Sequence, residues 1–198
     1  MTVLTDFLSS VMMLYVLVDP IGNIPLFIAI TSRMEREQRH RTLKLSVLVA
    51  AGILAVFSLF GTELLRVFGI SIGDFVIACG LVLSTFSLYY LLRPYEQRVV
   101  SGGLEIAVVP LAVPFLAGPA SISYVVLLSG SAGPLFTLLV VAAVSALSLA
   151  TLAASEPLLR ILGVIGLRVI EKIMLLLCVA LGVSLLRRGF EQWLRAGS

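Results

Sequence analysis

Long apolar stretches separated by short polar breaks run along the whole chain. A helix needs roughly 20 apolar residues to cross a hydrocarbon core about 30 Å thick, and each stretch here is at least that long. They predict six membrane-spanning helices over Leu4–Thr31, Leu43–Leu65, Phe68–Leu92, Leu104–Ser129, Pro134–Ala154 and Ile161–Leu186. The longest polar connection is Ser32–Lys44, and no Ser- or Gly-rich linker is visible. We therefore predict one all-α transmembrane domain over residues 1–198.

Composition strengthens this prediction. Of the 198 residues, 60% are hydrophobic and 13% charged, with a mean hydropathy of +1.13, which leaves too little polar surface to cover a water-soluble core. The net charge of +3 comes with basic residues in loops beside the spans, a pattern that favours lipid headgroups over nucleic acid as partner. Cys79 and Cys178 lie inside apolar runs, far from any metal-ligand spacing, so we expect free thiols and no bound metal or cofactor.

The Lys/Arg distribution predicts an orientation in the membrane. Ten of the 14 basic side chains follow spans one, three and five, and four lie on the opposite side. Basic loops stay in the cytoplasm, so residues 32–44 should be cytoplasmic and both termini periplasmic, in a multi-pass protein of the inner membrane. Arg187, Arg188 and Arg195 near the C-terminus oppose this assignment.

An internal repeat appears when the sequence is shifted by 94 residues. Among only 8 prolines, two pairs share this separation, and a glycine pair shares it too: Pro20 with Pro114, Pro25 with Pro119, and Gly69 with Gly163. Each copy holds three spans, so the second must enter the membrane from the opposite side. We predict two inverted three-helix repeats, residues 1–95 and 103–198, an architecture that recurs in secondary transporters.

The paired prolines predict that helices one and four are discontinuous. Proline lacks a backbone N–H, clashes with the preceding turn and pushes the residue before it out of the α region. Freed backbone groups at membrane depth are tolerated only inside protein or beside a wet cavity. Half-helices that start at Pro25 and Pro119 would present N–H groups suited to a carboxylate. The carbonyls of the preceding halves would suit an ammonium group or a cation, so a zwitterion fits between them.

Several polar residues beside these breaks are candidates for binding. Asp19 is an ionisable residue deep in a span, and it could contact a substrate ammonium, couple protons or cap the break. Asn23 could bind solute or backbone, and Ser121 and Ser123 could bind solute or their own helix carbonyls. The full set is Asp19, Pro20, Gly22, Asn23, Pro25, Pro114, Ala117, Gly118, Pro119, Ala120, Ser121 and Ser123. Ser145, Ser148 and Thr151 share a face of span five, which we assign to helix packing.

Two motifs resemble a known family. DPIGNIPLF at Asp19–Phe27 and VVPLAVPFLAGPASIS at Val108–Ser123 are similar to the MarC family, also called the SnatA-type neutral amino-acid transporters. The resemblance covers essentially the whole chain. It implies transport of small neutral amino acids such as glycine and alanine, held between the two unwound segments. Many relatives have glycine where this chain has Ala120, so the identity of the substrate stays open.

Three classes of function compete. A secondary transporter, with coupling to H+ or Na+ and its direction left open, agrees best with two broken helices; no P-loop for direct ATP use is present. An enzyme is disfavoured because the single histidine, His40, lies in a polar loop and no paired aspartates occupy a span. A non-transporting scaffold or envelope-stress component would gain nothing obvious from unwound helices. We therefore expect a small solute and the lipid bilayer as partners, with a homo-oligomer left open.

Overall fold

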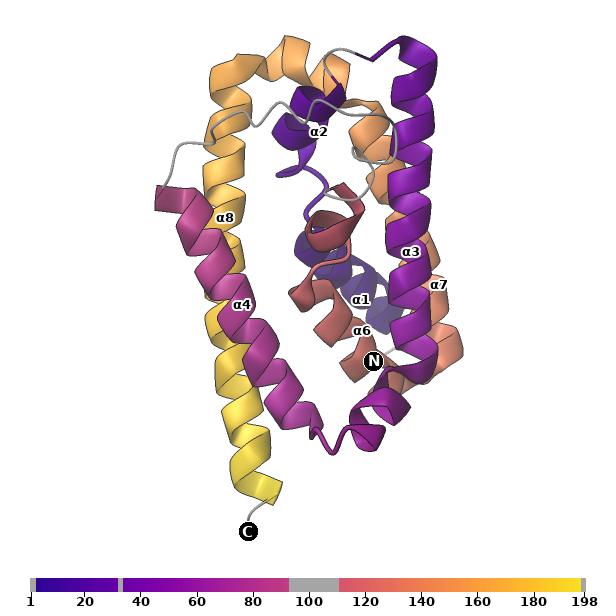
Figure 1. Ribbon diagram of the computed structural model, residues 1–198, viewed down its shortest axis with the longest axis vertical. Helices are drawn as coiled ribbons and strands as arrows, with labels where there is room; N and C mark the ends of the chain where they lie inside the picture. The colour runs from indigo at the N-terminus through magenta and orange to yellow at the C-terminus, as the bar shows by residue number, and fades with distance from the viewer. Residues whose placement is uncertain (1–2, 32–33, 93–110, 197–198) are drawn as a thin grey trace.

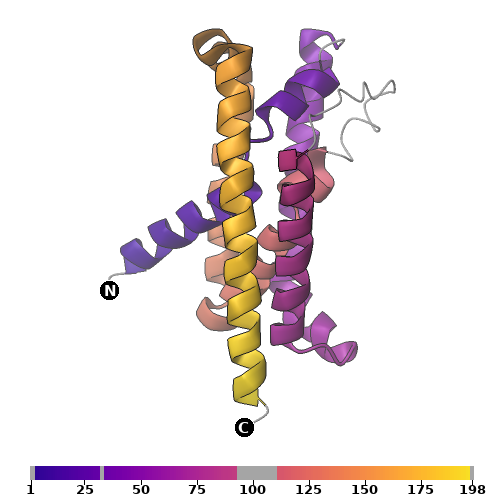
Figure 2. The same cartoon turned by 90° about the vertical axis from the view of Figure 1, so that its left-hand side faces the viewer.

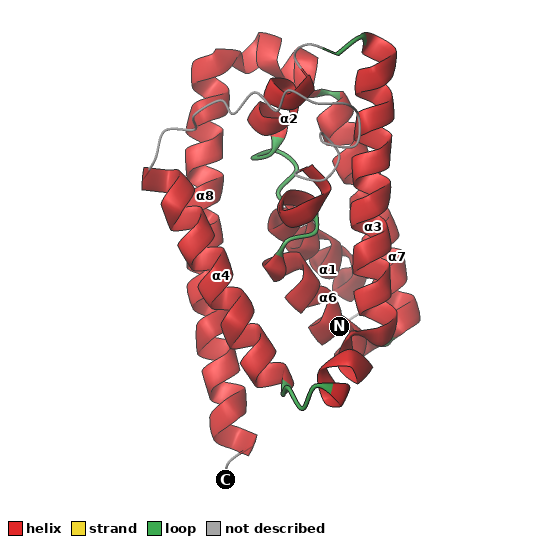
Figure 3. Ribbon diagram, in the orientation of Figure 1, coloured by secondary structure: helices red, strands yellow, loops and turns green. Residues whose placement is uncertain are grey.

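The computed structural model describes residues 3–31, 34–92 and 111–196, and the regular structure within these ranges is entirely helical (Figures 1 and 3). In chain order the elements are α1 (Val3–Val18), α2 (Ile24–Thr31), α3 (Arg36–Val67), α4 (Ile72–Leu92), η1 (Leu111–Leu116), α6 (Pro119–Ala132), α7 (Pro134–Ala153) and α8 (Ser155–Ala196). The loop before the fourth predicted span and the first residues of that span, up to Pro110, lie outside the described residues.

Four of the described helices are long and apolar enough to cross a membrane. They are α3, Ile72–Tyr89 of α4, α7 and Arg168–Leu194 of α8, and they correspond to predicted spans two, three, five and six. The first predicted span is split into α1 and α2, and the described part of the fourth is split into η1 and α6. The prediction of an all-α membrane protein is therefore confirmed, with both splits at the proline motifs.

The polar stretch between the first two spans is more helical than its sequence suggests. Helix α3 begins at Arg36, so most of the predicted connection Ser32–Lys44 is part of the helix. Its Arg, Glu, Gln and Lys residues are good helix formers. Thr42, Leu43 and Ser46 are also buried, so tertiary packing continues onto this first part of the helix.

Helix α8 likewise begins earlier than predicted and is interrupted within its length. It starts at Ser155, with only Ala154 between it and the end of α7, and Gly163 inside it has φ 65° and ψ 176°. This left-handed φ is accessible to glycine because it has no Cβ. Gly69, in the connection from α3 to α4, has a matching φ of 66°.

The long helices form two antiparallel pairs with the split segments between them. Figure 1 shows α3 beside α7 on one side and α4 beside α8 on the other, with α2, η1 and α6 between the pairs. Figure 2 shows α4 running alongside α8, and α1 extending away from the long helices toward the N-terminus. The α3–α7 pair is antiparallel because Arg39 of α3 meets Glu156, just beyond α7, whereas Ser58 of α3 donates to the Pro134 carbonyl where α7 begins.

Close backbone contact holds the α4–α8 pair. A Cβ atom on Gly80 would lie 2.7 Å from the Gly182 carbonyl oxygen, and one on Gly189 would lie 2.9 Å from the Gly73 carbonyl oxygen. The two glycine pairs are seven residues apart on each helix. Small residues at this spacing let helices approach closely where lipid surrounds them.

The main core surrounds the two splits. Leu14 of α1, Ile24 of α2 and Leu111 of η1 are fully buried in a cluster with α3 and α7. Large apolar side chains such as Leu48 and Phe60 of α3 remain more than half exposed. A membrane protein needs such an apolar exterior because it faces lipid.

Candidate functional site

The first split follows Val18, where Asp19 takes a left-handed conformation. Its φ is 47°, and its N–H donates to the Tyr15 carbonyl at 3.0 Å to complete the last turn of α1. Proline at position 20 disfavours a right-handed helical conformation for the residue before it. Aspartate tolerates the left-handed region better than most residues, because its short side chain can hydrogen-bond locally.

The Asp19 carboxylate folds over the split. Its Oδ1 accepts the Gly22 N–H at 3.0 Å, and the Asp19 carbonyl accepts the Asn23 N–H at 3.2 Å. A Cβ on Gly22 would lie 2.2 Å from Asp19 Oδ2, so only glycine leaves room for the carboxylate there. Among the roles considered for Asp19, this hydrogen bond corresponds to capping of the interrupted helix.

Asn23 binds the backbone at the end of α1. Its Nδ2 donates to the Val18 carbonyl at 3.2 Å and to the Asp19 carbonyl at 2.9 Å, and the side chain is buried. The interruption releases the Val18 carbonyl from helical bonding, because the Gly22 N–H donates to the Asp19 carboxylate instead. Asn23 therefore supplies, from within the same segment, a hydrogen bond that the helix lost.

The second split also combines non-helical residues before prolines with a side chain that hydrogen-bonds to the backbone. Val113, before Pro114, has an extended backbone, and so has Gly118, with φ −90° and ψ 172°, before Pro119. Pro119 is the first residue of α6, where a missing N–H costs no helical hydrogen bond. The Ser121 hydroxyl donates to the Gly118 carbonyl at 2.9 Å and approaches the Leu116 carbonyl at 3.3 Å.

The other predicted site residues divide into three groups. Pro20, Ala117 and Ala120 are buried beside the splits, and the side chains of Pro25 and Pro114 lie outside the described part of the chain. Ser123 of α6 is fully buried beside the Cys79 thiol of α4.

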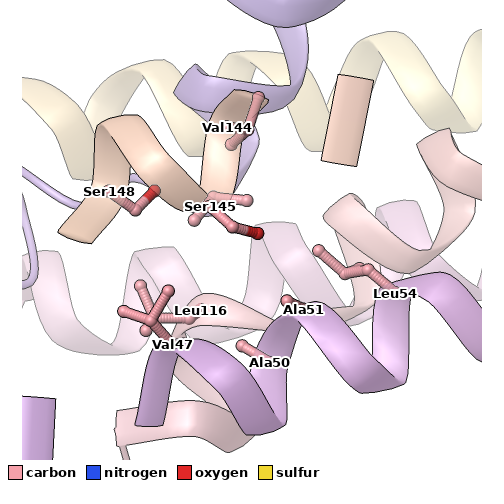
Figure 4. A pocket seen from close by; sticks show the side chains of 9 residues that line it. Val47, Ala50, Ala51, Leu54, Leu116, Val144, Ser145 and Ser148 are labelled. Carbon is pink, nitrogen blue, oxygen red and sulfur yellow. The ribbon is translucent and has the colours of Figure 1, made fainter. Parts of the chain in front are cut away.

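Both splits border one cavity. Its volume is about 10 Å³, and it lies between the last residue of α1, Val18, and the last residue of η1, Leu116. Helices α3 and α7 complete the wall, and Figure 4 shows the α7 serines across from the α3 residues. The lining residues are Val18, Val47, Ala50, Ala51, Leu54, Leu116, Val144, Ser145 and Ser148. Figure 3 shows the two splits as non-helical segments in the middle of the molecule.

Ser148 is one of the three residues on span five that the sequence analysis assigned to helix packing. It is 2% exposed, and its hydroxyl has no hydrogen-bond partner among the residues described. The Ser145 hydroxyl donates to the Val141 carbonyl of its own helix at 2.7 Å. A buried hydroxyl without a partner is costly unless it serves another group, so Ser148 belongs among the candidate binding residues. The only sequence signal for Ser148 was the spacing of three residues that puts it on one face of span five with Ser145 and Thr151.

The fold defines an integral, multi-pass membrane protein with two interrupted helices. The profile of the MarC family of integral membrane proteins matches residues 4–194, and the chain belongs to that family.

Curated relatives of similar length support this membership. A UPF0056 membrane protein of Methanocaldococcus jannaschii is 31% identical over 196 residues, which cover 93% of this chain and 96% of the relative. The UPF0056 membrane protein YhcE of Escherichia coli is 34% identical over 190 residues, 90% and 88% of the two chains. The UPF0056 inner membrane protein YhgN of the same organism is 26% identical, over 97% and 100%. No solved structure gives a significant match to the chain.

Proposed function

We propose that this protein is a secondary transporter that moves small neutral amino acids, such as glycine or alanine, across the inner membrane. The observation that carries the proposal is the cavity shared by the two split helices, with the unpartnered Ser148 hydroxyl in its wall. Interrupted helices at membrane depth are typical of transporter binding sites. A wall of apolar residues and serines suits a small, uncharged side chain.

The two halves of the chain support an inverted repeat. Spans two and five, α3 and α7, pair antiparallel, and so do spans three and six, α4 and α8. Equivalent spans of an inverted repeat must run in opposite directions. Gly69 and Gly163, which the shift of 94 residues aligns, also share a left-handed φ of 66° and 65°. We therefore interpret the six spans as two inverted three-helix repeats that could exchange conformations.

The small cavity represents a closed form of the site. A volume of about 10 Å³ admits little more than one water-sized sphere, and even glycine is larger. Binding a solute therefore requires the α3 and α7 walls to separate from the splits. Such a rearrangement is what alternating access demands of a transporter, and we place the substrate between Val18 and Leu116.

The proposed membrane and orientation follow from the relatives and the basic residues. The relative YhgN is named an inner membrane protein, which supports an inner-membrane location, and the excess of Lys and Arg after spans one, three and five favours a cytoplasmic position for residues 32–44. Both termini would then be periplasmic.

The test is uptake of radiolabelled alanine and glycine by proteoliposomes that hold only this protein. We expect saturable flux in the presence of a Na+ or H+ gradient, and we expect Ser148→Ala to reduce it. The matched control is Ser145→Ala, whose hydroxyl is already bound to its own helix and should matter little. Absence of flux for glycine, alanine and serine under every gradient would refute the proposal. A scaffold would also show no thermal stabilisation by these amino acids.

A further inference from the structure

A larger hollow lies between α6 and the C-terminal part of α8. Its volume is about 390 Å³, within the range of small-molecule sites. Helix α6 contributes Tyr124, Leu127, Leu128 and Ser131, and α8 contributes Arg188, Glu191 and Gln192. We name this hollow the α6–α8 cleft.

We propose that the α6–α8 cleft is an access site that binds the zwitterionic head of an amino acid before it reaches the split helices. The Arg188 guanidinium would take the carboxylate, and the Glu191 carboxylate would take the ammonium group. This inference rests on the proposed transport function and adds a binding site outside the two splits.

The chemistry of the α8 wall supports a zwitterion. Arg188 and Glu191 are three residues apart, so they lie on one face of the helix and offer opposite charges close together. A guanidinium is well shaped to bind a carboxylate through two parallel hydrogen bonds. Glu191 would disfavour an anion at this position and Arg188 would disfavour a cation, so the pair selects for a molecule that carries both charges.

These two side chains are accessible and not held in a tight pair. The neighbouring Arg187 reaches Glu191 only at 4.0 Å and is 72% exposed, so that contact is weak. Arg188 forms no ion pair within the described residues. A solute can therefore engage the pair without first breaking a strong interaction.

The cleft reaches close to the second split. Tyr124 is five residues beyond Pro119, which corresponds to roughly 8 Å along a helix. Tyr124 packs against a small buried cluster of Leu17, Val76, Ala120 and Leu185, and Ala120 directly follows Pro119. This apolar cluster thus connects the cleft wall with the start of α6.

Arg39, near the start of α3, joins α3 to α2 and to the start of α8. Its guanidinium forms an ion pair with Glu156, donates to the Ser155 hydroxyl at 3.0 Å and lies 5.1 Å from the ring centroid of Phe27 in α2. The Arg39 side chain is only 19% exposed. A solute that entered beside Arg39 would have to break these contacts, whereas the ion pair beside the cleft, between Arg187 and Glu191, is weak.

The first test compares two adjacent arginines in the proteoliposome uptake assay. Arg188→Gln should raise the half-saturation concentration for alanine about fivefold, as expected for one exposed charge contact, and leave the maximal rate unchanged. Arg187→Gln, on the same helix but outside the cleft, should behave as the wild type. Equal half-saturation concentrations for the two variants, with an active wild type, would overturn the access site and leave the transporter proposal standing.

The second test measures occupancy of the cleft directly. Ser131→Cys, in a chain that carries Cys79→Ala and Cys178→Ala, places a single thiol in the cleft wall. Millimolar alanine should slow its reaction with a membrane-impermeant maleimide several-fold, and Arg188→Gln should abolish this protection. Unchanged labelling with uptake intact contradicts the access site alone. If alanine protects no thiol in the single-thiol chain, and neither this chain nor the wild type takes up alanine, both proposals are contradicted.

Discussion

Replacing Gly22 with alanine should break the cap of the first split without touching any other element. The added Cβ would lie 2.2 Å from Asp19 Oδ2, 2.8 Å from Cγ and 2.9 Å from Oδ1, distances that no real methyl group occupies. The φ of Gly22 is not left-handed, so the backbone accepts alanine. The three atoms nearest to the added methyl group all belong to the Asp19 carboxylate, so we expect the effect to come from its displacement.

The magnitude follows from the contact that is lost. The displaced carboxylate gives up the Gly22 N–H at 3.0 Å, and a hydrogen bond to a charged group contributes about 1.5–3 kcal/mol. Loss of an N-cap in water costs about 0.5–2 kcal/mol, which overlaps this range. We expect Gly22→Ala to lower the free energy of unfolding by about 2 kcal/mol.

A double-mutant cycle with Asp19→Ala isolates the mechanism. Unfolding titrations of the purified protein with SDS in mixed micelles would give the free energy for the wild type, both single variants and the double variant. Once the carboxylate is absent, the Gly22→Ala substitution should cost almost nothing further. The control is Gly52→Ala on α3, where a Cβ would meet no atom within 4 Å and stability should not fall.

Additive costs in this cycle would refute the reasoning, because they would show that the methyl group collides with something other than the Asp19 carboxylate. A Gly52→Ala loss as large as that of Gly22→Ala would equally refute it, since the cost would then reflect any glycine in the membrane.

Three further substitutions test other contacts by the same titrations. Gly80→Ala would put a methyl group 2.7 Å from the Gly182 carbonyl oxygen, and this overpacking of backbone against backbone should cost about 1–3 kcal/mol; a neutral result would place the α4–α8 helices further apart. Tyr15→Phe removes a hydroxyl 2.7 Å from Thr151 Oγ1 and should cost about 1 kcal/mol, a loss that should vanish when Thr151→Val is already present. Ser148→Ala removes a buried hydroxyl without a partner in the described structure and should raise stability by about 1 kcal/mol while it slows alanine uptake. A destabilised Ser148→Ala protein would show that this hydroxyl has a partner.

The split helices could be predicted because their cause is local. Proline at positions 20 and 119 lacks an N–H and restricts the residue before it, whatever the rest of the chain does. The structure accordingly ends α1 at Val18 and begins α6 at Pro119. The four long helices α3, α4, α7 and α8 could also be predicted, since spanning a hydrocarbon layer imposes a minimum length and composition on each one.

The first part of α3 could not be predicted from the same signal. A polar stretch rich in Arg, Glu and Gln is compatible with a loop or with a helix, and hydropathy does not separate the two. Burial of Thr42 and Leu43 against other elements decides in favour of the helix. Contacts of that kind connect residues far apart in sequence, as Arg39 with Glu156 illustrates.

The sequence by itself determined which apolar stretches are helical, where two of them break and which residues could cap the breaks, because these properties depend on covalent geometry and on neighbours within one or two turns. Only the tertiary structure decided that Asp19 caps Gly22, that Ser148 has no partner beside the shared cavity, and that Arg188 and Glu191 line a cleft whereas Arg187 does not. A hydroxyl or a charge acquires its role from the atoms within about 3 Å of it, and in a helical bundle many of those atoms come from helices distant in the sequence.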